Sequence, residues 1–145
     1  MSFTVIILAA GKGSRMKSST SKPLHKIAGC EMIQWVLEAS REAGAAQIIP
    51  VIRKEMSDLA SYLSDYSTAI QKEANGTADA VVAALPHVRN LNLPVIVLYA
   101  DTPFITAEII SSLYQKINSG NDICVLGFHT DNPYGYGRLI QSSTG

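Results

Sequence analysis

Short runs of apolar, mostly β-branched residues alternate along this chain with segments whose apolar residues recur at helical spacing. We expect strands at residues 4–8, 47–52, 68–71, 94–99 and 123–129, and helices at residues 32–43, 55–64, 77–85 and 107–117. Strands that are apolar on both faces are typical of parallel sheets, whose strands are joined by right-handed helical crossovers. The pattern therefore predicts an α/β fold with three layers, α/β/α, and a mostly parallel sheet that binds ligands at the carboxyl ends of its strands.

Two features of the expected core follow from the same pattern. The run at residues 94–99 has the strongest strand character in the chain, so we expect it to lie centrally in the sheet. Trp35 falls within the apolar stripe of Ile33, Val36 and Leu37, and we expect all four side chains to be buried.

Composition limits the class of protein. The chain has 145 residues, the size of one domain, and 47% of them are hydrophobic against 17% charged, which excludes intrinsic disorder. It has neither an apolar run long enough to cross a membrane nor a secretory signal, so we expect a cytoplasmic protein without membrane partners. Cys30 and Cys124 lack the spacing of a disulfide framework or zinc site, and His25, His87 and His129 share no catalytic pattern.

The charges are distributed unevenly, although Lys plus Arg and Asp plus Glu both total 12. Residues 1–30 hold five basic residues and no acid, and residues 31–145 hold 7 basic against 12 acidic residues, a net charge of −5. A balanced total argues against a nucleic-acid partner where the charges are evenly spread. Here the basic N-terminal segment indicates a local anion site, and we expect no nucleic-acid partner.

A glycine-containing loop follows the first expected strand within this basic segment. Gly11 and Gly13 would let backbone amides approach a ligand closely, while Lys12 and Arg15 would supply positive charge for phosphates. The Walker and dinucleotide-binding patterns both fail here, and an ordinary turn is the alternative interpretation of the glycines alone.

The sequence around this loop resembles a known family. Leu-Ala-Ala-Gly-Lys-Gly-Ser-Arg-Met at residues 8–16, followed by Lys-Pro-Leu at 22–24, resembles the signature of sugar-1-phosphate nucleotidyltransferases. The continuation at residues 24–29 is most similar to the N-acetylglucosamine-1-phosphate uridyltransferase branch. Three further stretches follow in the family's order: Gln71 with Gly76-Thr77, residues 98–104 ending a strand at Asp101, and Gly-Tyr-Gly-Arg at residues 135–138.

The resemblance implies a Rossmann-like nucleotide-diphospho-sugar transferase fold and a reaction. UMP would pass from UTP to N-acetylglucosamine 1-phosphate with Mg²⁺, giving pyrophosphate and UDP-N-acetylglucosamine, a precursor of peptidoglycan and the cell wall. It implies catalytic roles for Arg15 and Lys22 and a metal-binding role for Asp101. The implied nucleotide-binding residues are Leu8, Ala9, Ala10, Gly11, Gly13, Gln71, Gly76 and Thr77, and the implied sugar-binding residues are Tyr99, Ala100 and Gly137. The Gln71 amide offers both a donor and an acceptor to the edge of uracil.

Three positions depart from the family's pattern and bear on substrate choice. Ala100 replaces the usual Gly, Asp79 stands where His is common, and Ser21 replaces the usual Pro. The family's pyrophosphorylase domain is longer than this chain and an acetyltransferase β-helix follows it. Because residues 142–145 contain no closing element, we expect residues 1–145 to be the single-domain, nucleotide-binding part of a truncated domain, which self-associates through an exposed sheet edge.

Two alternative functions stay open at this point. One is a related sugar-phosphate or cofactor nucleotidyltransferase that uses another nucleotide, such as GTP or CTP. The other is a nucleotide-binding fragment or degenerate copy without catalysis.

Overall fold

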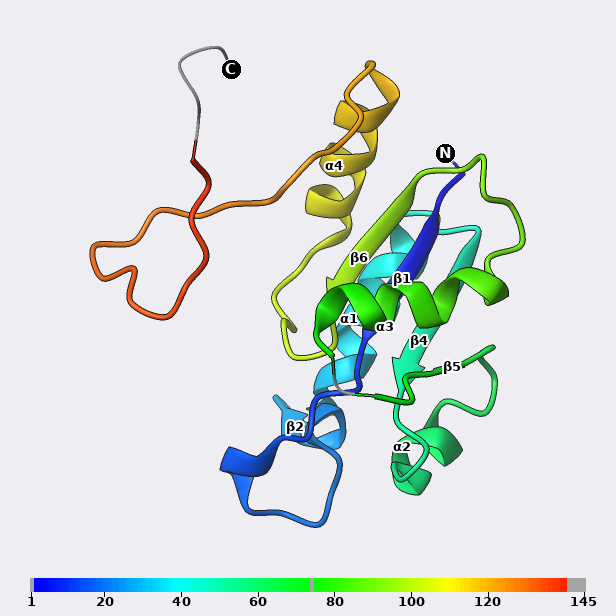
Figure 1. Cartoon of the computed structure of the whole chain (residues 1–145), viewed down its shortest axis with the longest axis vertical. Helices are drawn as coiled ribbons and strands as arrows, with labels where there is room; N and C mark the ends of the chain where they lie inside the picture. The colour runs from blue at the N-terminus through cyan, green and yellow to red at the C-terminus, as the bar shows by residue number, and fades with distance from the viewer. Residues whose placement is uncertain (1, 74, 141–145) are drawn as a thin grey trace.

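The computed structural model describes residues 2–73 and 75–140 of the chain, and its main sheet is parallel throughout. This sheet has the strand order β5-β4-β1-β6 (Figure 1). Its strands are β1 (Thr4–Leu8), β4 (Gln47–Ile52), β5 (Ala69–Ile70) and β6 (Val95–Tyr99). A separate antiparallel pair consists of β2 (Lys26–Ile27) and β3 (Cys30–Glu31).

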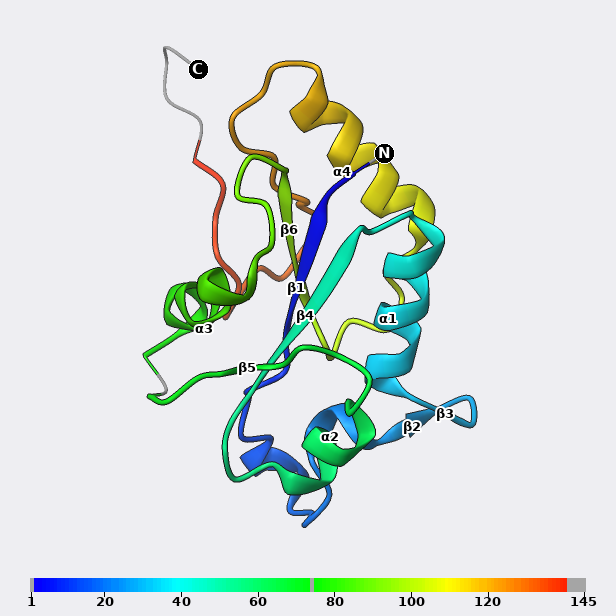
Figure 2. The same cartoon turned by 90° about the vertical axis from the view of Figure 1, so that its right-hand side faces the viewer.

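Helices cover both faces of the main sheet. They are α1 (Met32–Glu42), α2 (Ser57–Tyr62), α3 (Thr77–Ala84) and α4 (Ala107–Asn118), with short 3₁₀ helices at Ser14–Met16, Lys22–Leu24 and Leu85–His87. Figure 2 shows α1 and α4 on one side of the strands and α3 on the other. The three-layer α/β/α architecture with a mostly parallel sheet is therefore confirmed.

The central strand β1 contributes to a core on each side of the sheet. Val5 and Ile7 are fully buried in the cluster that contains residues of α1 and α4. Ile6 points the opposite way, into the smaller cluster with Ile49 of β4 and Ala80 of α3. Burial on both faces explains why this strand is continuously apolar.

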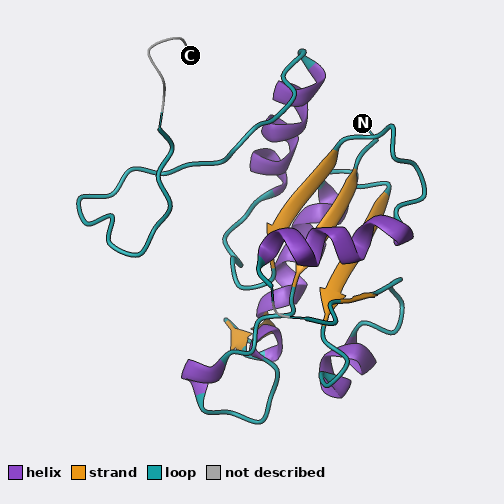
Figure 3. Cartoon of the chain, in the orientation of Figure 1, coloured by secondary structure: helices purple, strands orange, loops and turns teal. Residues whose placement is uncertain are grey.

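Two expectations about the sheet are wrong. Residues 123–129 do not form a strand, and Figure 3 shows this segment as loop. A strand needs a hydrogen-bonded neighbour, and the described residues of this segment pair with none. Because no described strand pairs with the outer side of β6, this strand lies at the edge of the sheet and not in its centre. Val95 and Val97 are about 40% exposed, whereas Ile96 and Leu98 are buried.

The expected burial of Trp35 is also wrong, whereas Ile33, Val36 and Leu37 are buried as expected. Trp35 is 36% exposed and lies at the border of the buried stripe of α1. Its indole nitrogen donates a hydrogen bond to the Ile27 carbonyl at 3.2 Å, which places the ring against the β2–β3 pair.

Two further observations concern expectations about membranes and the end of the chain. None of the helices in the described ranges is both long and apolar enough to span a membrane. The expectation that residues 142–145 lack a closing element lies outside the described residues.

Candidate active site

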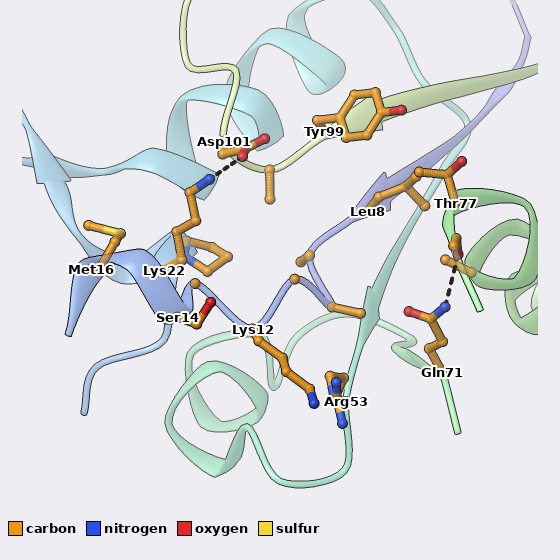
Figure 4. Close-up of a pocket in the computed structure, with 18 of the residues that line it drawn as sticks. Leu8, Lys12, Ser14, Met16, Lys22, Arg53, Gln71, Thr77, Tyr99 and Asp101 are labelled. Carbon is orange, nitrogen blue, oxygen red and sulfur yellow. Dashed lines mark hydrogen bonds and ion pairs between the residues drawn. The ribbon is translucent and has the colours of Figure 1, made fainter. Parts of the chain in front are cut away.

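A cavity of about 630 Å³ lies at the carboxyl ends of the parallel strands, as the α/β architecture predicts. The residues that follow β1, β4, β5 and β6 all contribute to its lining. Figure 4 shows this cavity with Lys22 and Asp101 at one end and Gln71 and Thr77 at the other.

The fold brings all but one of the expected site residues together in this cavity. Those that line it are Leu8, Ala9, Ala10, Gly11, Gly13, Arg15, Lys22, Gln71, Gly76, Thr77, Tyr99, Ala100 and Asp101. Gly137 is the exception, because it lies in the exposed segment that follows α4. The chemical roles of these residues stay predictions.

The loop after β1 is shaped by Gly13, which has a left-handed backbone with φ of 59°. A Cβ added at Gly13 would lie 2.9 Å from Cβ of Lys22, too close for an ordinary contact. Gly13 is therefore required both for the turn into the 3₁₀ helix Ser14–Met16 and for the close approach of Lys22.

A Gly13→Ala variant is expected to weaken the binding of inorganic tripolyphosphate, because the new methyl group pushes Lys22 out of the cavity. Alanine at this backbone angle also costs about 1–3 kcal/mol of folding free energy. Isothermal calorimetry and urea unfolding would measure the two effects. Gly11→Ala is the control for stability, since a Cβ there meets nothing within 4 Å and the Gly11 φ is not positive. Unchanged anion affinity in Gly13→Ala would contradict the role given to Gly13.

Lys22 and Asp101 form an ion pair at one end of the cavity. The Lys22 ammonium donates to Oδ2 of Asp101, and their side chains are 31% and 39% exposed (Figure 4). Asp101 follows β6, whereas Lys22 begins the 3₁₀ helix after the glycine loop. The pair joins a cation suited to phosphate and a carboxylate suited to a hard metal ion, so a phosphate and a metal ion would each replace one partner of the pair.

Ser21 holds the neighbouring segment against α2. The Ser21 amide and hydroxyl donate to the two carboxylate oxygens of Asp58, at 2.8 and 2.6 Å. Desolvation raises the pKa of Asp58, but hydrogen bonds from Ser21 and from the amides of Leu59 and Asp58 outweigh it, so this pKa lies below its usual value of 3.8. Ser21 thus anchors the loop that carries Lys22. It stands where the sugar-1-phosphate nucleotidyltransferases that the sequence resembles usually have proline.

Asp58→Asn is expected to destabilise the protein at neutral pH, because asparagine cannot accept both hydrogen bonds from Ser21. A carboxylate whose pKa is lowered by folding contributes stability that is complete above its unfolded pKa and is lost as the pH falls through the lower folded value. The difference in unfolding free energy between wild type and Asp58→Asn should therefore shrink below pH 3.8. Urea unfolding at several pH values tests this, and a difference independent of pH would contradict it.

Gln71 lies at the other end of the cavity with its amide held in one orientation. The amide nitrogen donates to the Gly76 carbonyl at 3.0 Å and to Oδ2 of Asp79 at 2.9 Å. Both partners can only accept hydrogen bonds, so the end of the amide that faces them must be the nitrogen. Figure 4 shows a dashed line to the nitrogen of the Gln71 amide, with the oxygen on the other side. Within the chain both N–H groups of the Gln71 amide have partners, so its oxygen is the part left open to a ligand; that Gln71 offers a ligand both a donor and an acceptor stays a prediction.

Sequence reasoning missed one charged residue of the cavity, Arg53, which follows β4 directly. Its side chain is 18% exposed. The available signal was its place after a buried strand, at the same edge of the sheet as the glycine loop. Ser14, Met16, Pro23 and Ala80 also line the cavity without having been assigned a role.

Comparison with models of protein families identifies the family to which the chain belongs. The model of the MobA-like NTP transferase domain matches residues 5–142. The chain belongs to this family. The bifunctional protein GlmU of Maricaulis maris (strain MCS10) is 42% identical over 145 residues, which cover 98% of this chain and 32% of that protein. The chain thus spans about a third of the length of the curated relatives it matches.

Several solved structures share the fold of this chain. Rv0371c from Mycobacterium tuberculosis H37Rv matches with a TM-score of 0.70 and 19% identity, covering 82% of this chain and 62% of that one. A second structure of Rv0371c, in complex with manganese, has a TM-score of 0.65 and 18% identity, covering 81% and 60%. UDP-glucose pyrophosphorylase in complex with UDP-glucose has a TM-score of 0.64 and 23% identity, covering 81% and 55%.

The carboxylates of this MobA-like domain limit how it could hold a metal ion. The described residues contain no cluster of three or more His, Cys, Asp or Glu side chains that could hold a metal ion. Asp101 is the carboxylate that lines the cavity among these residues. One carboxylate fits Mg²⁺, which keeps several waters and is commonly bound by one or two carboxylates together with substrate phosphates.

Proposed function

We propose that this MobA-like domain binds UTP in the cavity and belongs to an enzyme that transfers UMP to N-acetylglucosamine 1-phosphate. The observation that carries the proposal is the convergence of the glycine loop, Gln71, Lys22 and Asp101 in one cavity at the carboxyl edge of the sheet. The 42% identity to a GlmU protein over nearly the whole chain supports the uridine nucleotide and the amino sugar. The chain would then supply the nucleotide-binding part of the enzyme.

The reaction requires positioned charge and no covalent intermediate on the protein. An oxygen of the sugar phosphate forms a bond to the α-phosphorus of UTP while the bond from that phosphorus to the pyrophosphate oxygen breaks. Two polyanions must be aligned, and the charge on the equatorial oxygens must be stabilised. Lys12, Arg15 and Lys22 would neutralise the triphosphate, and the backbone amides at Gly11 and Gly13 would bind it.

The metal and sugar assignments rest on the same cavity. Asp101 would hold a divalent cation, for which we propose Mg²⁺; when bound, the ion would neutralise charge on the phosphates. Tyr99 and Ala100 line the cavity beside Asp101, where the acceptor sugar would lie. Self-association through an exposed sheet edge stays a prediction.

Titration calorimetry with UTP, CTP, GTP and ATP in the presence of Mg²⁺ tests the proposal. UTP is expected to bind most tightly. Equal affinity for all four nucleotides would overturn the uridine assignment, and absence of binding would overturn the proposed function. Pyrophosphate release from UTP, with N-acetylglucosamine 1-phosphate or glucose 1-phosphate as acceptor, tests the choice of sugar.

A further inference from the structure

Arg53 lines the cavity and has a buried nitrogen, Nη1, that lacks a hydrogen-bond partner. Within residues 2–73 and 75–140, Nη1 of Arg53 and Nε2 of His25 are the buried side-chain nitrogen or oxygen atoms that lack a hydrogen bond. Of these two residues only Arg53 lines the cavity. Nε of Arg53 lies 3.5 Å from Oε2 of Glu55, whose side chain is 74% exposed, so this contact is weak.

A guanidinium nitrogen that is shielded from water without gaining a hydrogen-bond partner destabilises the folded protein. Its persistence in a ligand cavity is explained if a ligand supplies the missing acceptor. Arginine suits this role because its planar group keeps its charge and presents several N–H donors in fixed directions.

The sheet places Arg53 beside Gln71. Ile52 of β4 is aligned with Ile70 of β5, and the Gln71 amide donates to the Ile52 carbonyl at 2.9 Å. Val51 and Ala69 pack in the cluster below α3, and Arg53 and Gln71, two residues further along each segment, both line the cavity. In Figure 4, Arg53 is drawn between Lys12 and Gln71.

The two side chains provide complementary groups. Asp79 and the Gly76 carbonyl occupy the Gln71 amide nitrogen, so Oε1 is the part of this amide free to meet a ligand, and it accepts only. Arg53 donates only. Uracil offers a ring N–H flanked by two carbonyl oxygens, which can satisfy both at once, whereas cytosine presents an unprotonated ring nitrogen at that position.

We propose that Arg53 reads the nucleotide base together with Gln71, donating to a uracil carbonyl while Gln71 Oε1 accepts from the adjacent ring N–H. This inference rests on the proposed function, because it needs a uridine nucleotide in the cavity. It gives Arg53 a role distinct from that of Lys12, Arg15 and Lys22, which would contact the phosphates.

Arg53→Met tests the proposal by separating base from phosphate. Calorimetry on the 145-residue chain with UTP and inorganic tripolyphosphate gives the two affinities. The variant is expected to raise the Kd for UTP by about 10- to 100-fold, the effect of losing one hydrogen bond to a charged group. The Kd for tripolyphosphate should stay within about threefold of wild type. The ratio of the Kd for CTP to the Kd for UTP should also fall.

Two further variants sharpen the test. Lys54→Met removes the same charge from the adjacent residue, which is exposed and does not line the cavity, so it measures the general electrostatic effect. Arg53→Lys keeps the charge but removes Nη1, and it is expected to weaken UTP binding without affecting tripolyphosphate. It also serves as the second variant if Arg53→Met does not fold.

The outcomes separate the inference from the proposed function. Wild-type UTP affinity in the Arg53 variants would overturn the base-reading role and leave the proposed function standing. Equal losses for UTP and tripolyphosphate would make Arg53 a phosphate-binding residue and would also overturn the inference. Absence of UTP binding by the wild-type chain would overturn both.

Discussion

Asp101→Asn is expected to reduce uridylyl transfer by the proposed enzyme by about two orders of magnitude or more, because a divalent cation contributes several kcal/mol of charge stabilisation in phosphoryl chemistry. The measurement is pyrophosphate release at a range of Mg²⁺ concentrations. The variant should also lose most of the dependence of UTP affinity on Mg²⁺, since Asp101 is the carboxylate among the described residues that lines the cavity.

The same substitution should have the opposite effect on binding without metal. In the structure Lys22 pairs with Asp101, so the carboxylate competes with phosphate for the ammonium group. Removing this negative charge should leave Lys22 free, and UTP or tripolyphosphate should bind at least as tightly as to wild type in the presence of a chelator.

Asp65→Asn is the matched control, because Asp65 is an exposed carboxylate that does not line the cavity. It should behave like wild type in both assays. If Asp101→Asn weakened metal-free UTP binding, Asp101 would contact the nucleotide itself. If Mg²⁺ dependence persisted unchanged in that variant, the ion would bind elsewhere.

The second large effect concerns stability. Ile7→Ala should lower the free energy of unfolding by about 2–5 kcal/mol, the usual cost of truncating a fully buried isoleucine. Ile7 is 0% exposed and lies on β1, which has a strand neighbour on each side. The cavity left by the lost atoms would lie under α1 and α4, where surrounding groups are already close-packed.

Urea unfolding followed by circular dichroism measures this change. Val82→Ala is the control, because Val82 is 61% exposed on α3 and alanine has the higher helix propensity. Its stability should equal that of wild type within about 0.5 kcal/mol. A similar small effect for Ile7→Ala would show that the β1 core is loosely packed in solution.

Residues 123–129 show where prediction of strands from local sequence pattern failed. Local pattern predicts a strand at both residues 94–99 and residues 123–129, and the prediction is correct for the first run only. Backbone pairing with β1 stabilises β6, whereas the later run pairs with no described strand. Local composition reports the tendency to be extended, but the hydrogen-bonded partner that makes a strand comes from elsewhere in the chain.

The sequence by itself determined the α/β fold class and most of the residues that meet in the cavity. Periodicity reflects which faces of an element are buried, and the order of elements places every strand end at one edge of the sheet. The resemblance to sugar-1-phosphate nucleotidyltransferases then implied which residues at that edge form the site. Tertiary structure alone decided what each side chain is free to do there. Asp79 fixes the Gln71 amide, Asp101 pairs with Lys22, and Arg53 is left without a partner for Nη1. These properties depend on neighbours supplied by other elements, so no local pattern encodes them.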